Sequence, residues 1–169
     1  MRKLILISAA VAFLGACEVR RDEAAGTGQR VAPAGAVSQD EAEKIVGAAH
    51  AAFTSGDAFQ IMEHYAPGAS VFDPAHIDAT TDRATQTKWT ADFVAMKPSD
   101  LVTQPREVRV LDADTIVASG IAAFLAQMGP NRQRLRVRYS QVFERQSDGR
   151  WLIVHEHMSM PPGPAGPGA

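Results

Sequence analysis

The sequence predicts one α+β domain, with three helices packed on one face of a curved antiparallel sheet. Apolar residues recur at helical spacing within residues 38–96. Residues 101–160 instead contain long runs typical of strands, separated by short turn sequences rich in Asp, Gly and Asn. A chain of 169 residues has room for one such domain with extensions. We therefore expect the folded domain at 38–160.

The first helix has a clear start and a clear end. Ser38 can cap a helix, and Glu41 follows three residues later, which is the spacing of a capping box. Gly56 is a stop signal, and Asp57 can cap the next helix. A second, short helix is expected at 58–65.

One strand is expected before the third helix. The sequence SVFDP, at 70–74, reads as a short strand that Pro74 stops. The third helix is expected at about 81–96. Four strands then follow at 101–111, 115–127, 132–146 and 151–160, the first of which Pro105 could interrupt.

The beginning of the chain has the pattern of a bacterial secretion signal. Arg2 and Lys3 precede an apolar run that is too short to span a bilayer comfortably. The run ends in LGAC, which resembles the lipobox of bacterial lipoproteins, in which the cysteine is lipidated and becomes the new N-terminus. We expect residues 1–16 to be removed and Cys17 to carry acyl chains such as palmitate. The alternatives are an ordinary signal cut near Ala16 and an uncleaved anchor.

The cysteine content agrees with lipidation. Cys17 is the only cysteine, so an intrachain disulfide is impossible, and lipidation would remove a free thiol from an oxidising compartment. We expect the domain to be lipid-anchored in a bacterial cell envelope, facing the periplasm or the outside. Residues 17–37 read as a flexible tether, and residues 161–169 as a disordered Pro/Gly tail.

The charge balance argues against nucleic acid as a partner. The formal net charge is −2, and no basic block stands out. No cofactor is expected.

The last strand places polar residues inside the apolar run WLIVHEHMSM. Because a strand alternates its faces, successive residues should point to opposite sides of the sheet. One side should carry Trp151, Ile153, His155 and His157. The other side should carry Leu152, Val154, Glu156 and Met158. The turn decides which residues of the preceding strand join each side. A three-residue loop with Gly149 in a bulge places Tyr139 and Phe143 beside the histidines, whereas a two-residue loop exchanges the partnership. We favour the bulge because it groups the apolar side chains.

A metal site is one hypothesis for the two histidines. His155 and His157 could present two nitrogens to an ion, with Asp73 or His76 as a third ligand. No HExxH motif and no cysteine set accompanies them, so we favour hydrogen bonding within the sheet or an interface and predict no metal site.

Two blocks of sequence carry a resemblance to a known family. They are HYAPGASVFDP at 64–74 and VFERQSDGRWLIVHEHMSMP at 142–161. Through them the whole domain resembles the NTF2-like superfamily, in particular its SnoaL-like group, and is similar to the association (hub) domain of calcium/calmodulin-dependent kinase II. The resemblance implies a cone-shaped NTF2-like fold. This scaffold serves dehydratases, isomerases, polyketide cyclases, epoxide hydrolases and non-catalytic domains, so it does not fix the function.

The sequence departs from the kinase hub domains, which line their cavity with arginines on three strands. In this chain the corresponding positions hold Ile121, Val142 and Met158, so the carboxylate-binding pocket is not carried over. Three arginines on a later strand could replace some of that charge, although we favour a solvated or partner-facing side for them. They are Arg134, Arg136 and Arg138.

The leading functional hypothesis is a membrane-tethered domain, homodimeric through its sheet, that binds a small organic molecule in an apolar cavity. The expected ligand-binding residues are Tyr65, Trp89, Glu156, His157 and Met158.

Two other hypotheses remain open. The first is an isomerase or dehydratase with Asp73 as general base, because a carboxylate in an apolar cavity has a raised proton affinity. Tyr139 and His155 are its candidate catalytic partners. The second is a hub-like oligomerisation module with a vestigial cavity. His50 is expected on the surface or in ordinary helix packing.

Overall fold

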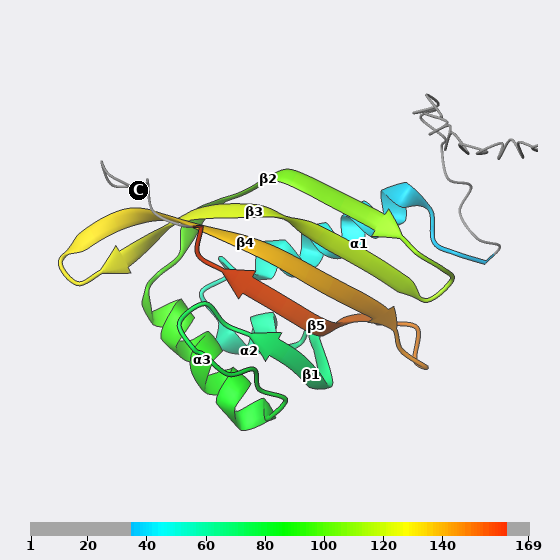
Figure 1. Cartoon of the computed structure of the whole chain (residues 1–169), viewed down its shortest axis with the longest axis horizontal. Helices are drawn as coiled ribbons and strands as arrows, with labels where there is room; N and C mark the ends of the chain where they lie inside the picture. Colours follow the sequence, from blue (N-terminus) through cyan, green and yellow to red (C-terminus); the bar gives the residue numbers. More distant parts are fainter. Residues whose placement is uncertain (1–34, 162–169) are drawn as a thin grey trace, which may run out of the picture. The chain divides into compact units, whose positions relative to one another are not determined.

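The computed structural model describes residues 35–161 (Figure 1). The predicted signal peptide, the lipidation at Cys17 and nearly all of the predicted tether and tail lie outside these residues. No helix within the described part of the chain is long and apolar enough to cross a membrane.

The helices begin where capping residues predict. Helix α1 (Gln39–Ala52) starts after Ser38, whose hydroxyl accepts a hydrogen bond from the backbone N–H of Glu41 at 3.2 Å. Helix α2 (Ala58–Met62) is capped by Asp57, and α3 (Arg83–Ala95) by Asp82. Helix α2 is shorter than predicted, because the chain enters a strand at Tyr65.

Five strands of the described region form one sheet in the order β1-β5-β4-β3-β2. Their bounds are Tyr65–Phe72 for β1, Ser99–Val110 for β2, Thr115–Met128 for β3, Asn131–Arg145 for β4 and Trp151–Ser159 for β5. The antiparallel meander β2 to β5 and the α+β class are confirmed. The sheet is nevertheless mixed rather than wholly antiparallel, because β1 runs parallel to β5. Parallel pairing is possible because α3 and three strands separate the two in the chain.

Strand β2 runs through Pro105 without ending. The pairing of β2 with β3 shifts register between Thr103 and Arg106, so the predicted interruption takes the form of an irregularity within a continuous strand.

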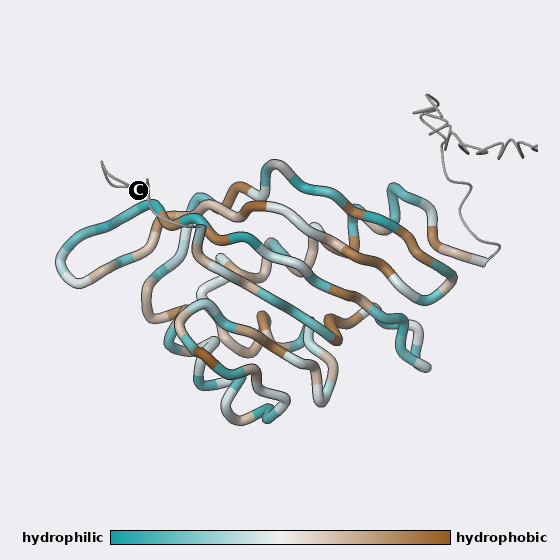
Figure 2. Tube along the Cα trace, viewed as in Figure 1, coloured by the Kyte–Doolittle hydropathy of each residue, from teal (hydrophilic) through white to brown (hydrophobic). Residues whose placement is uncertain are grey.

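The helices cover one face of the sheet, which we call the inner face. In Figure 1, α1 runs behind the sheet and α2 lies beside α3. The core lies between these helices and the sheet and includes Val46, Ile116, Phe143 and Ile153, none of which is more than 1% exposed. Figure 2 shows both hydrophobic and hydrophilic segments along the strands. Burial alternates along much of β4, as expected when only one face of a sheet is covered.

The turn between β4 and β5 has the predicted form. Gln146 and Arg150 are joined by a backbone hydrogen bond of 2.7 Å around a three-residue loop, in which Gly149 has φ 85°. This turn places Phe143 opposite Ile153 on the inner face.

A second irregularity follows within β5. Phe143 pairs with Ile153 and the adjacent Val142 pairs with His155, so Val154 is an extra residue on the β5 side. This bulge exchanges the two faces for the rest of the strand. Glu156, rather than the histidines, therefore continues the inner face beyond Ile153.

Candidate functional site

A cavity of about 480 Å³ lies between the helices and the inner face of the sheet. Its walls are largely apolar and aromatic, and they come from all three helices and from every strand. Among the apolar side chains are Phe53, Met62, Trp89, Phe93, Phe124 and Met158. The cavity therefore has the size and lining typical of a site for a small organic molecule.

A buried carboxylate, that of Glu156 on β5, faces this cavity at 1% exposure. The hydroxyl of Tyr65 donates to its Oε1 at 2.8 Å, and the amide Nε2 of Gln141 donates to its Oε2 at 2.5 Å. Burial raises the pKa of Glu156 from 4.5 to about 6, against the two hydrogen bonds, which favour the charged form. The carboxylate also raises the pKa of Tyr65, adding to the larger effect of burial.

The network continues from Gln141 to helix α1. Its Oε1 lies 2.9 Å from Nε2 of His50, which is 6% exposed. Burial lowers the pKa of His50, so its imidazole is neutral at neutral pH. Glu156, Gln141 and His50 therefore form one hydrogen-bonded chain across the inner end of the cavity.

Three buried polar atoms of the cavity wall have no hydrogen-bond partner among the described residues. They are Nδ1 of His50, the hydroxyl of Tyr139 and Oε1 of Gln86. The rings of His50 and Tyr139 meet edge to face with centroids 5.0 Å apart. Burial raises the pKa of Tyr139 to about 12, so its hydroxyl remains protonated.

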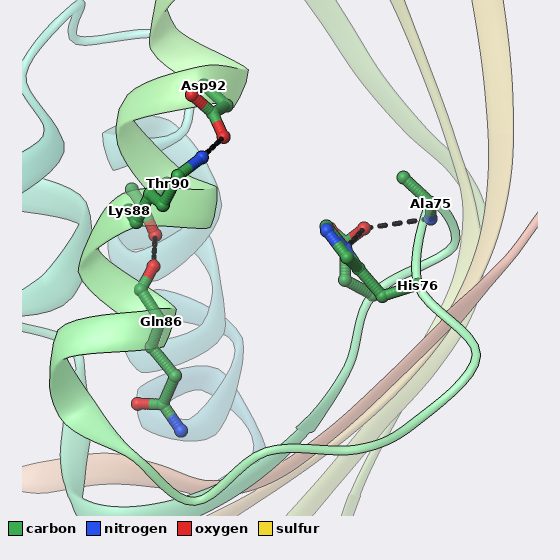
Figure 3. Close-up of polar contacts among 7 residues, drawn as sticks. Ala75, His76, Gln86, Lys88, Thr90 and Asp92 are labelled. Atoms are coloured by element: carbon green, nitrogen blue, oxygen red, sulfur yellow. Dashed lines mark hydrogen bonds and ion pairs between the residues drawn. The ribbon is translucent and has the colours of Figure 1, made fainter.

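A second polar group lies at the more exposed end of the cavity. Asp73 follows β1 directly, and its Oδ1 accepts from the backbone N–H of Ala75 at 2.8 Å and lies 3.0 Å from Nδ1 of His76. The ring of His76 stacks on Trp89 of α3 at 4.0 Å between centroids. Figure 3 shows the loop of Ala75 and His76 facing the helix that carries Gln86 and Thr90. The loop thus presents an oriented imidazole beside the cavity.

Most of the predicted site residues line the cavity. Six of the eight do so: Tyr65, Asp73, Trp89, Tyr139, Glu156 and Met158.

His155 and His157 do not line the cavity, contrary to their predicted catalytic and ligand-binding roles. They point to the uncovered outer face of the sheet, where their rings contact Phe72 at 5.9 Å and 5.4 Å between centroids. The physical reason is the bulge at Val154, which reverses the alternation predicted for β5. Tyr139 and Phe143 consequently share a face with Glu156 and not with the histidines.

Three arginines of β4 also lie away from the cavity. Arg134, Arg136 and Arg138 are exposed and alternate with Leu135, Val137 and Tyr139, which line it. Their exposure confirms the prediction that they lie on a solvated side and do not enter the cavity.

The residues proposed as a metal site are not brought together. Asp73 and His76 line the cavity, whereas the two histidines of β5 lie on the other face of the sheet. Within residues 35–161, no group of three or more His, Cys, Asp or Glu side chains is placed to hold a metal ion.

Sequence reasoning missed His50 and Gln141. His50 lies one helical turn from Val46 and Phe53, on the apolar side of α1, so its position already indicated burial. Gln141 alternates with Tyr139 and Phe143 on β4, and a lone amide in such a series is a signal of a buried polar contact.

Comparisons with known proteins agree with this architecture. The family model described as a SnoaL-like domain matches residues 42–163. A structure from Xanthomonas campestris, named for the association domain of calcium/calmodulin-dependent protein kinase II, is 25% identical. Its TM-score is 0.68, and the match covers 79% of this chain and 95% of that one. No curated protein matches the sequence.

Two solved structures named as enzymes share the fold at lower identity. One, named as a dehydratase from the NTF2-like family of Streptomyces avermitilis, is 20% identical with a TM-score of 0.62, over 75% of this chain and all of that one. The other is an epoxide hydrolase/cyclase-like enzyme with a role in pyran ring formation in salinomycin. It is 19% identical with a TM-score of 0.56, over 73% of this chain and 93% of that one.

Proposed function

The chain belongs to the SnoaL-like domain family, and from this premise we propose that it binds a small, largely apolar organic molecule in the cavity between its helices and its sheet. The main support for this proposal is the cavity itself, which has a volume of about 480 Å³, an apolar and aromatic wall and a few polar groups that converge on it. Binding sites for small molecules have this composition because apolar contact supplies affinity and sparse polar groups supply orientation.

The charges of the wall restrict the ligand. Asp73, Asp92 and Glu156 line the cavity, and the described lining contains no lysine or arginine. An anionic ligand would meet carboxylates in a poorly solvated space, which is costly. The proposed ligand is therefore not an anion.

Native mass spectrometry of the Cys17→Ser chain, purified without detergent, tests this proposal. We expect an added mass of one small organic molecule, or uptake of one from a set of neutral bicyclic aromatic probes. Ala122→Phe places a large side chain in the cavity and should prevent binding, because Ala122 lines it. Ala123→Phe, on the outer face of the same strand, is the matched control and should bind normally. A chain that takes up no probe, or equal uptake by the Ala122→Phe variant, would refute the proposed site.

A second candidate is acid–base catalysis on the bound molecule. The specific observation is the Asp73–His76 pair at 3.0 Å, in which the carboxylate orients an imidazole that Trp89 also holds by stacking. In this scheme His76 is the base and Asp73 positions it, which revises the expectation that Asp73 acts directly. The fold shared with structures named as enzymes supports the candidate.

Variants at this pair separate catalysis from binding. With a substrate in hand, His76→Gln should abolish turnover and leave the dissociation constant within about threefold, and Asp73→Asn should lower kcat. Full activity of the His76→Gln variant would remove the candidate.

We also propose that the domain is held at the bacterial cell envelope through lipidated Cys17, with residues 18–37 as tether. The order of charged start, apolar run and LGAC in the sequence supports this proposal.

Homodimerisation through the outer face of the sheet is a further part of the proposal. Val102 is 50% and Phe72 38% exposed on this uncovered face, and apolar surface of this kind favours a partner. Light scattering should give a dimer, and Ile121→Asp should give a monomer. Ile121 pairs with the exposed Arg138 and does not line the cavity, in contrast to the hub position to which the sequence matched it. A large ring would favour the hub-like alternative instead.

A further inference from the structure

Two adjacent residues of the cavity wall have polar atoms that nothing in the described structure satisfies. His50 on α1 is 6% exposed and Tyr139 on β4 is 5% exposed, and both line the cavity. Within residues 35–161, Nδ1 of the first and the hydroxyl of the second have no hydrogen-bond partner. Because an unpaired buried polar group costs free energy, such a pair points to a group that the ligand itself supplies.

The hydrogen-bond chain determines what Nδ1 of His50 can do. The carboxylate of Glu156 accepts from the amide nitrogen of Gln141, which turns the amide oxygen of Gln141 toward His50. Nε2 of His50 must therefore carry the proton that this oxygen accepts. Because the imidazole is neutral, Nδ1 has a free lone pair and can only accept a hydrogen bond.

The hydroxyl of Tyr139 has the complementary capacity. It remains protonated and can donate its hydrogen, and its ring lies edge to face with that of His50 at 5.0 Å. The two residues together offer one acceptor and one donor at the same end of the cavity.

We propose that His50 and Tyr139 form a subsite for a neutral hydroxyl group of the ligand, an alcohol or a phenol. The ligand O–H donates to Nδ1 of His50, and the ligand oxygen accepts from the hydroxyl of Tyr139. This inference rests on the proposed function and deepens it by naming the chemical class of the ligand.

Other groups satisfy the pair less well. A ketone or ether oxygen accepts from Tyr139 and leaves Nδ1 of His50 unpaired. An ammonium group could donate to both residues, but burying a cation is costly. The carboxylate of Glu156, which could offset that cost, already accepts two hydrogen bonds from the protein.

A matched set of probes tests the subsite on the Cys17→Ser chain at pH 8. Calorimetry compares 2-naphthol, which can donate and accept, with 2-methoxynaphthalene, which can only accept, and 2-methylnaphthalene, which can do neither. A fourth probe, 2-(aminomethyl)naphthalene, carries the cation. We expect 2-naphthol to bind about tenfold more tightly than each of the other three.

Two variants then test whether the preference for 2-naphthol comes from Nδ1 of His50 and the hydroxyl of Tyr139. His50→Gln keeps an amide N–H for Gln141 and removes the ring nitrogen, and Tyr139→Phe removes only the hydroxyl. Each should reduce the preference for 2-naphthol over 2-methylnaphthalene to less than threefold while the methyl probe still binds. His157→Gln, on the outer face, is the matched control and should keep the tenfold preference.

The outcomes separate this inference from the proposed function. Equal binding of the neutral probes, tighter binding of the amine, or a preference that survives both variants would overturn the hydroxyl subsite and leave the cavity proposal intact. If none of the probes binds, both proposals are wrong. Retained binding of 2-methylnaphthalene shows directly that each variant is folded.

Discussion

The amide Nε2 of Gln141 lies 2.5 Å from Oε2 of Glu156, on the neighbouring strand of the sheet. The two residues pair across β4 and β5 on the inner face, so the sheet itself holds the amide against the carboxylate. A buried carboxylate without such donors would be strongly destabilising, and here Tyr65 supplies a second one.

Burial of Glu156 makes stability depend on pH. Its pKa is about 6 in the folded protein against an ordinary value of 4.5, so between these pH values the folded chain holds a proton that the unfolded chain releases. The free energy of unfolding should therefore fall by up to about 2 kcal/mol as pH rises from below 4.5 to above 6, and this term should be constant at higher pH.

Urea unfolding of the wild type and of Glu156→Gln between pH 4 and 8 measures this term. The stability difference, wild type minus variant, should decrease across the window. Glu144→Gln, at an exposed position of β4, is the control and should follow the wild-type profile. Parallel profiles for wild type and Glu156→Gln would show that the carboxyl is not perturbed.

The two tyrosines should differ in their contribution to stability. Tyr65→Phe removes a hydroxyl that donates to the carboxylate of Glu156 and should lower the free energy of unfolding by about 1.5–3 kcal/mol at pH 8. Tyr139→Phe removes a buried hydroxyl that has no hydrogen-bond partner in the described part of the chain, and it should cost less than about 0.5 kcal/mol or be stabilising. Chemical denaturation of both variants measures the two losses in the free energy of unfolding. Equal losses would contradict the hydrogen-bond assignments.

The two tryptophans allow the cavity to be observed. Trp89 lines the cavity, whereas Trp151 packs against the core outside its lining. Adding 4-tert-butylcyclohexanol, which does not fluoresce, should change the tryptophan emission of the wild type and of Trp151→Phe. Trp89→Phe should show no change. A response carried by Trp151 would mean that the probe binds elsewhere.

Lipidation predicts a change of compartment in one variant. Cys17→Ser should release the protein from the membrane fraction of expressing bacteria into the soluble envelope fraction, because a serine cannot carry the thioether-linked lipid. Fractionation followed by mass spectrometry checks this. Unchanged fractionation would favour the uncleaved anchor that the sequence left as an alternative.

The boundaries of several elements could be predicted from the sequence because the residues that mark them act over short distances along the chain. Ser38 and Asp57 cap helices through contacts with residues two or three positions away, and the turn at Gly149 needs only a residue that tolerates positive φ. Such signals do not depend on the rest of the chain, so they predicted α1 and the turn between β4 and β5 correctly.

The orientation of side chains was predicted only in part. Tyr139 and Glu156 were expected near a cavity and line it, but His155 and His157 were assigned to the wrong face. The error came from one residue, because the bulge at Val154 reverses every later position of the strand. No glycine or proline within β5 announces this bulge.

The sequence by itself determined the class of the fold and the order of its elements, because periodicity and caps act over a few residues, and it named six of the residues that line the cavity. Only the tertiary structure decided that β1 pairs in parallel with β5 and that Glu156, Gln141 and His50 join in one network. These features depend on contacts between residues up to 91 positions apart, and local spacing can indicate that a side chain is buried but does not identify its distant partner.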